Sequence, residues 1–247
     1  MTLRMNRSSG RSLWQMWQSA ALGLAILATL FVLAGCNQPS LPSATSLLAA
    51  AAQHFNDAKT FHFVMTSDHL GPKQTGSPTL SDLSAADGDV QRPDRLSANG
   101  TVDLGGITVS TKLIIVGQRA WFLNPLTGNF DEEDDYAGFV GIFDPAKGLG
   151  IAITSLRNLS LPSDGSSNGT PCWKISGDVD TATLGSLLGE AANPAKPPRA
   201  TICIGKTDGR LYSVVITGQL VTGDLDNTTR TFVLSKYDAP VNIQPPA

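Results

Sequence analysis

The sequence predicts an α+β protein in which a few helices cover one face of a long antiparallel sheet. Charged residues make up 16% of the 247 residues, whereas Gly, Ser, Thr and β-branched residues are plentiful. Runs of alternating apolar and polar residues recur along the chain, and turns typical of hairpins separate several of them. Helical spacing is restricted to one N-terminal segment and to short segments further along the chain.

The first 35 residues are expected to be an export signal. Three arginines precede an uninterrupted apolar block from about Ala20 to Leu33, and the first acidic residue is Asp57. The block has the length of a signal-peptide core and is shorter than the roughly 20 residues that span a bilayer. A transmembrane anchor that begins near Leu13 is the alternative, although two glutamines and a serine interrupt it.

The segment Leu33-Ala34-Gly35-Cys36 resembles the bacterial lipobox, in which the cysteine is acylated and becomes the new N-terminus. Several acyl chains such as palmitate, at about 0.8 kcal/mol per buried CH2, hold a protein durably on a membrane. We therefore expect Cys36 to be the lipidation site and 36–46 to contain a flexible tether. The protein would lie in the cell envelope, anchored by lipid to the outer face of the cytoplasmic membrane. A retained helix and secretion without modification are the alternatives.

The rest of the chain, 47–247, has the length of a single domain with a good-sized core. Without Arg4, Arg7 and Arg11, 15 basic residues (18 less three) face 21 acidic residues, which gives a net charge of about −6. This balance argues against a nucleic-acid partner.

The two remaining cysteines, Cys172 and Cys203, lie in strand-like runs, CWKIS and ATICIG. In an oxidising compartment we expect them to form a disulfide, provided that the two strands are neighbours. Two buried free thiols are the alternative. The chain has no Cys-x-x-Cys motif, so a redox centre is not expected.

The first predicted elements are a helix over 46–59, with Ser46 as its N-cap, and a strand over 60–69. Three large apolar residues share one face of this strand: Phe61, Phe63 and Met65. The polar segment 70–94 is expected to be a loop. Further strands are predicted over 96–106, 107–118 and 119–125.

The central segment 136–160 is expected to form two short helices divided by Pro145. Asp180 is expected to cap a short helix over 181–192. Four more strands are predicted over 172–179, 200–205, 210–220 and 229–238. The total is one sheet of about eight to ten strands, mostly in sequential order, which must twist and curl. The helices bury their apolar faces most simply on its concave side.

Catalytic and cofactor-binding motifs are absent from the sequence, so we expect neither an enzyme nor a cofactor. Two of the three histidines, His62 and His69, could bind a metal ion together with Asp68, but a solvent-facing strand histidine is the commoner case. The acidic run 131–135 lacks the spacing of an EF-hand loop, so weak calcium binding is the alternative to a solvated loop.

The predicted helices and strands carry many large apolar side chains. If the alternation holds, they face each other across the space between sheet and helices and line a cavity. The candidate lining residues are Phe61, Phe63, Met65, Leu113, Ile115, Phe139, Val140, Ile142, Phe143, Leu149, Ile151, Ile153, Trp173, Ile175, Ile202, Ile204, Val214, Ile216, Phe232 and Leu234. A solid core is the alternative, because composition does not distinguish a packed core from a hollow one.

Four segments, together with the lipobox, resemble the mycobacterial LppX/LprA/LprF/LprG lipoprotein family and, more distantly, the Lol-type lipoprotein carriers. They are LLAAAAQHFNDAKTFHFVMTS, GNFDEEDDYAGFVGIFDPAKGLG, KISGDV and VLSKYDAPVNIQPP. The resemblance implies a half-barrel sheet with helices on its concave face, enclosing an apolar cavity for acyl chains. The Cys172/Cys203 pair and the acidic run 131–135 depart from the family pattern.

The function that this resemblance implies is binding of multi-acylated lipids or glycolipids and their carriage within or across the cell envelope, with an envelope transporter as one conceivable partner. A structural or interaction lipoprotein with a filled core and a protein partner is the alternative. An envelope hydrolase is disfavoured because the sequence offers no set of nucleophile and base.

Overall fold

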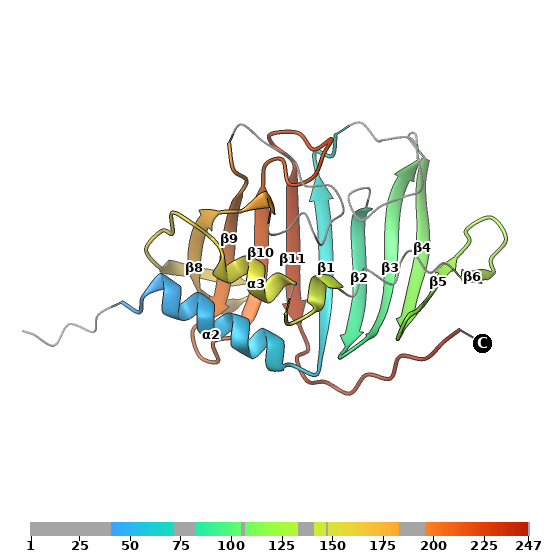
Figure 1. The fold of residues 1–247 in the computed structure, drawn as a ribbon, viewed down its shortest axis with the longest axis horizontal. Helices are drawn as coiled ribbons and strands as arrows, with labels where there is room; N and C mark the ends of the chain where they lie inside the picture. The colour runs from blue at the N-terminus through green and yellow to red at the C-terminus, as the bar shows by residue number, and fades with distance from the viewer. Residues whose placement is uncertain are drawn as a thin grey trace, which may run out of the picture. The chain divides into compact units, whose positions relative to one another are not determined.

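Eleven antiparallel strands form one sheet in the described part of the chain (Figure 1). The structure is a computed structural model, and it describes residues 41–71, 83–104, 107–132, 141–146, 148–182 and 196–246. The strands are β1 (Thr60–Asp68), β2 (Leu83–Gln91), β3 (Arg95–Leu104), β4 (Ile107–Val116), β5 (Arg119–Leu123), β6 (Phe130–Glu132), β7 (Ser163–Ser167), β8 (Thr170–Asp178), β9 (Arg199–Gly205), β10 (Leu211–Thr217) and β11 (Thr229–Ser235).

The order of the strands in the sheet is β6-β5-β4-β3-β2-β1-β11-β10-β9-β8-β7. Strands that are consecutive in the sequence therefore lie beside each other, apart from β6 and β7, which lie at opposite ends of the sheet. At the centre of the sheet the first strand pairs with the last. In that pair Phe63 lies opposite Leu234, and Met65 lies opposite Phe232. The predicted antiparallel meander is confirmed, with one strand more than the upper expected number.

The N-terminal helix α2 (Ala44–Asp57) starts two residues earlier than predicted. Its N-cap is Ser43, whose hydroxyl oxygen accepts a hydrogen bond from the backbone N–H of Ser46 at 3.1 Å, so the prediction of Ser46 as the cap was wrong. The helix ends at Asp57 because the next residue, Ala58, has an extended backbone. Its buried residues lie three or four apart, as one helix face requires: Leu48, Ala51, Ala52 and Phe55.

Strand β2 corrects the prediction of a loop over 70–94. Its inward residues are small, since Ala86 and Gly88 accompany Val90, and acidic residues occupy positions between them. These residue types are depleted in strands. Hydrogen bonds from β1 on one side and β3 on the other nevertheless hold the segment extended. Residues 72–82 of the predicted loop lie outside the described residues.

Two further strands, β6 and β7, were also missed, and both end the sheet. β6 includes Asp131 and Glu132 from the acidic run that was predicted to be a loop. β7 has the sequence SDGSS, in which no residue favours a strand. Both form because a hairpin partner, β5 or β8, supplies their hydrogen bonds.

The central segment contains a short 3-10 turn over 141–143 and the helix α3 (Leu149–Thr154), with Pro145 between them as predicted. Asp180 accepts a hydrogen bond from the backbone N–H of Ala182 at 3.0 Å, as a cap would, and 183–192 lie outside the described residues. No helix in the described ranges has both the length and the apolar character needed to cross a bilayer.

Cys172 and Cys203 form the disulfide expected from the sequence, with a Cα–Cα distance of 5.5 Å. The two residues lie on the neighbouring strands β8 and β9, where Lys174 is opposite Cys203 and Cys172 is opposite Gly205. Both cysteines are buried. The bond closes a loop across 31 residues and joins two strands near one edge of the sheet.

A buried ion pair holds the connection between β10 and β11. The Asp224 carboxylate accepts two hydrogen bonds from the Arg230 guanidinium, at 2.6 and 2.7 Å. It also accepts the backbone N–H groups of Leu220 and Val221, each at 3.0 Å. The side chains of Asp224 and Arg230 are only 4% and 7% exposed. Such a pair is tolerated in the interior because hydrogen bonds satisfy the charged groups.

Reduction of the disulfide is expected to lower the free energy of unfolding by about 3–4 kcal/mol, because the bond removes chain entropy from the unfolded state. Urea unfolding of the oxidised and reduced protein, followed by circular dichroism, measures the difference. The double variant Cys172→Ala/Cys203→Ala serves as the control and should not respond to reductant. An unchanged unfolding midpoint after reduction of the wild type would contradict the expectation.

The substitution Asp224→Ala is expected to lower the free energy of unfolding by about 3 kcal/mol, because it removes a buried acceptor from a charge and two backbone N–H groups. The matched control is Arg157→Ala, which breaks the 2.9 Å pair with Asp180 where the arginine is 74% exposed. That change should cost less than about 1 kcal/mol. Equal losses in the two variants, measured by chemical unfolding, would argue against the role given to Asp224.

Candidate functional site

One face of the sheet, here called the inner face, is apolar from β5 to β8. It is the face against which α2 packs, chiefly over β9 and β10, while α3 packs on α2. Figure 1 shows both helices in front of the half of the sheet that contains β8 to β11. Side chains from the helices and the sheet form one contiguous buried cluster. The sheet residues buried in it include Phe61, Phe63, Met65, Ala86, Val90, Leu96, Ala98, Ile115, Ala120, Ile175, Ala200, Ile202, Ile204, Leu211, Val214, Ile216 and Leu234.

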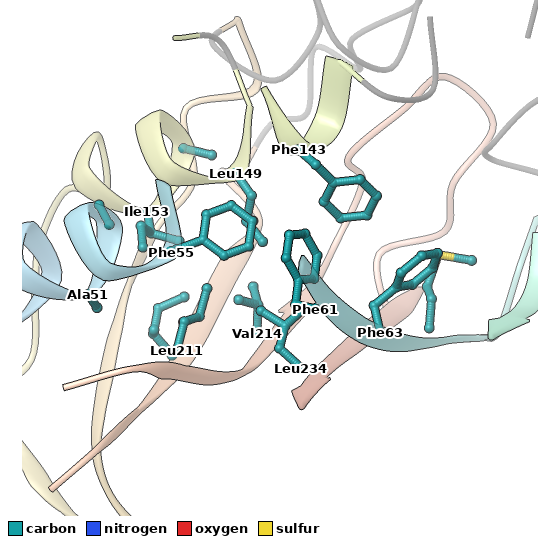
Figure 2. Close-up of a cluster of buried hydrophobic side chains, with 14 of the residues drawn as sticks. Ala51, Phe55, Phe61, Phe63, Phe143, Leu149, Ile153, Leu211, Val214 and Leu234 are labelled. Atoms are coloured by element: carbon teal, nitrogen blue, oxygen red, sulfur yellow. The ribbon is translucent and has the colours of Figure 1, made fainter. Parts of the chain in front are cut away.

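The centre of this cluster is a group of four phenylalanines from three elements (Figure 2). The Phe61 ring on β1 has its centroid 5.1 Å from that of Phe55 on α2 and 5.3 Å from that of Phe143 in the 3-10 turn. The ring of Phe63, also on β1, contacts that of Phe143 with 5.2 Å between the two centroids. These tilted and edge-on contacts pack the region beneath α2 and the turn tightly.

Most of the residues predicted to line a cavity lie in this cluster or against it. The buried ones are Phe61, Phe63, Met65, Ile115, Phe143, Leu149, Ile153, Ile175, Ile202, Ile204, Val214, Ile216 and Leu234, and Leu113, Ile142 and Phe232 are partly buried against them. Ile151 lies apart, because it is on the outward side of α3 and is 41% exposed. Trp173 is half-buried on β8, where the Lys206 ammonium lies 4.0 Å from its ring centroid. Phe139, Val140 and Cys36 lie outside the described residues.

The inner face of β2 and β3 carries a patch of small residues, Ala86, Gly88, Ala98 and Gly100. The sheet register places them in two adjacent rows, with Gly88 opposite Ala98 and Ala86 opposite Gly100. Larger residues flank the patch on both sides, since β1 contributes Phe63 and Met65 and β4 contributes Leu113. A methyl group on Gly88 would lie 2.6 Å from the Ala98 Cβ, so only glycine fits there. The inner face is therefore lowest over this patch, because its residues carry a methyl group or no side chain.

Arg92, directly after β2, lies at the rim of the aromatic group. Its Nη2 donates a hydrogen bond to the carbonyl oxygen of Phe55 at 3.1 Å, and its Nη1 donates to the carbonyl oxygen of Phe143. The guanidinium carbon lies 5.0 Å from the ring centroid of Phe55 and 5.5 Å from that of Phe61. Burial lowers the pKa of Arg92, and the negative charge of Asp144 acts in the opposite direction.

The polar residues singled out in the sequence do not form a metal site within the described ranges. His62 lies on the outer face of the sheet, where its Nδ1 is 2.9 Å from the Asp89 carboxylate and its Nε2 is 3.7 Å from that of Asp87. Glu132 of the acidic run accepts two hydrogen bonds from Arg119, which hold the pKa of its carboxyl below the usual value. His62 and Glu132 therefore each have a partner within the protein.

The outer face also carries an open pocket of about 410 Å³ beside the C-terminal segment. Its lining residues are mostly polar, and they are Asp89, Ser97, Lys112, Ile114, Pro240, Val241, Asn242, Ile243 and Gln244. The segment is held there because Ile243 donates its backbone N–H to the Gln91 side chain at 3.0 Å and accepts a hydrogen bond from Arg95 at 2.7 Å. The pocket is separate from the inner face, since Ile114 alternates with the inward Ile115.

Sequence reasoning missed several residues of the inner face. Val90 and Leu96 face inward on β2 and β3, but the first lay in the predicted loop and the second stands alone among polar neighbours. Phe55 and Ala51 belong to the apolar residues at helical spacing in the predicted N-terminal helix, and this spacing could have assigned them to the site. Arg92 gave no local signal, because its partners are 37 and 51 residues away in the chain.

Known structures resemble this fold. The structure of LprF from Mycobacterium bovis aligns with a TM-score of 0.63 and 20% identity, over 83% of this chain and 97% of that one. LppX from Mycobacterium tuberculosis aligns with a TM-score of 0.58 and 17% identity, over 82% of this chain and all of its own. These likenesses confirm the predicted half-barrel fold.

A LolA superfamily protein from Nitrosomonas europaea aligns with a TM-score of only 0.27 and 8% identity, over 83% of this chain and 96% of that one, which is too low to support an inference. Among curated proteins, none has a significantly similar sequence. The sequence model of the LppX_LprAFG lipoproteins matches residues 43–243, a range that contains every described helix and strand. The chain therefore belongs to the LppX_LprAFG lipoprotein family.

Proposed function

We propose that this protein is a membrane-anchored carrier that binds the acyl chains of multi-acylated lipids or glycolipids on its inner face and moves them within or across the cell envelope. Membership of a lipoprotein family supports the proposal at a general level. The observation that carries it is the width of the apolar inner face, which extends from β5 to β8, while the contacts of α2 with the sheet concentrate on β9 and β10.

The inner face provides the surface that hydrocarbon needs. An acyl chain exposed to water costs about 0.8 kcal/mol per CH2, so a lipid that leaves a membrane must be shielded along its length. The inner face is lowest over the small-residue patch, which lies between the larger residues of β1 and β4. The patch consists of Ala86, Gly88, Ala98 and Gly100. We place the acyl chains there, along β2 and β3.

The anchor would determine where the carrier works. Acylation of Cys36 would hold the domain at the outer face of the cytoplasmic membrane, and 36–46 would tether it there. The short tether would keep the inner face within reach of the bilayer, so that lipid could pass without crossing a long aqueous path. An envelope transporter that delivers or receives the lipid would suit this position, and no enzymatic step is required.

One observation favours the second candidate, a structural or interaction lipoprotein with a filled core. Beneath α2 and the 3-10 turn, the four phenylalanines pack at centroid distances of 5.1–5.3 Å, and that half of the sheet is solidly filled. The outer-face pocket beside 240–244 could then accept a protein partner. The two candidates differ in whether a lipid stays bound after purification.

The full-length chain purified from its own host is expected to retain a lipid with several acyl chains, because the proposed carrier holds these chains on its inner face. Native mass spectrometry of the intact complex detects the lipid as added mass, and fragmentation identifies its chains. Repeated preparations without any such lipid would support the filled-core candidate.

Enlarging the small-residue patch is expected to weaken lipid retention. Ala98→Phe adds a ring to the inner face between β2 and β4 and should lower the bound fraction at least fivefold, because it occupies the space assigned to acyl chains. The matched control is Asn99→Phe, the same change at the neighbouring exposed position on the outer face. Thermal unfolding checks that both variants fold, and equal lipid retention in the two would refute the placement.

A further inference from the structure

We infer that Arg92 binds the anionic headgroup, a carboxylate or a phosphate, of a lipid whose acyl chains lie on the inner face. The inference rests on the proposed function and adds the class of lipid that the site prefers. Two features of Arg92 support it, its position between the apolar cluster and water, and its lack of a carboxylate partner within the described part of the chain.

Arg92 lies where the acyl chain of a bound lipid would end and its polar headgroup would begin. Phe61 and Phe55 are fully buried in the cluster, while the Arg92 side chain that lies over both rings is only partly buried. It follows Val90 by two residues and so continues the inward row of β2 to the end of the sheet. A chain lying along β2 would therefore bring its polar end to the guanidinium.

The bonding of Arg92 leaves donors for a ligand. A guanidinium carries five N–H groups, and the two carbonyl oxygens of Phe55 and Phe143 account for two of them. Its Nε is buried and has no hydrogen-bond partner. The described ion pairs engage other cations, including Arg119, Arg157, Arg199, Lys206, Arg210 and Arg230.

The buried Arg230 offers a comparison within the molecule. Arg230 on β11 is paired bidentately with Asp224, which supplies a full negative charge to its guanidinium. Arg92 receives two neutral carbonyl oxygens and two aromatic faces instead. An arginine held partly out of water without a counter-charge favours an anion that arrives with the ligand.

The surroundings of Arg92 limit the charge that the site accepts. The charge of Asp144 acts on Arg92, and the Asp144 carboxylate already accepts the backbone N–H of Ala146 at 2.7 Å. The negative charge of Asp144 would repel a second negative charge on the headgroup. A headgroup with a single negative charge should therefore bind better than one with two, whether the acid is a carboxylate or a phosphate ester.

The test uses the full-length chain in detergent micelles and counts bound lipids by native mass spectrometry. Two matched pairs separate charge from chain number: oleate against oleyl alcohol, and dioleoyl phosphatidic acid against dioleoylglycerol. In at least one pair the wild type should retain the acidic member about tenfold more than its neutral analogue. Arg92→Gln should reduce this ratio to about twofold or less, and Arg92→Lys should keep most of it.

The control variant is Arg95→Gln, which removes a neighbouring arginine that bonds to Ile243 on the outer face and should leave both ratios unchanged. A wild type that retains acidic and neutral lipids equally overturns the inference whether or not the Arg92 variants fold. A uniform loss of all four lipids in Arg92→Gln also overturns it, because a merely structural contact with α2 would have that effect. Retention of none of the four lipids by the wild type would instead refute the proposed function.

Discussion

The pairing of the first strand with the last is the interaction on which the rest of the structure depends. β1 and β11 join two meanders, β1–β6 and β7–β11, into one sheet, and their register sets Phe63 beside Leu234 and Met65 beside Phe232. Because side chains alternate along a strand, a shift of one residue in this register would turn one half of the apolar face outward. The continuous inner face, and every function assigned to it, therefore requires this one ladder of hydrogen bonds.

Elements with strong local patterns could be predicted from the sequence. The alternation of Phe61, Phe63 and Met65 identified both the strand and its inward face, and the spacing of Leu48, Ala51 and Phe55 identified the helix to within two residues. Hairpin-type turns were also predicted from residue type, and Gly117 and Gly209, which lie between consecutive strands, each have a positive φ.

Elements that form because of their neighbours could not be predicted. β2, β6 and β7 consist largely of Ala, Gly, Ser and acidic residues, and hydrogen bonds from the strands beside them hold them extended. The same limit applies to the site. Alternation assigned large side chains such as Ile115 and Ile202 to the inner face, but the contacts of Arg92 depend on two segments that only the folded chain brings together.

The open sheet has a consequence at its two ends. No further strand pairs with β6 or β7 in the portion of the chain that the structure covers, so both present unpaired backbone groups. β6 is only three residues long and includes Asp131 and Glu132, and the Asp164 side chain on β7 is 81% exposed. Short length and charge at such an edge hinder its joining to the edge of another molecule. Copies crowded together on a surface would thus remain separate instead of growing into fibres.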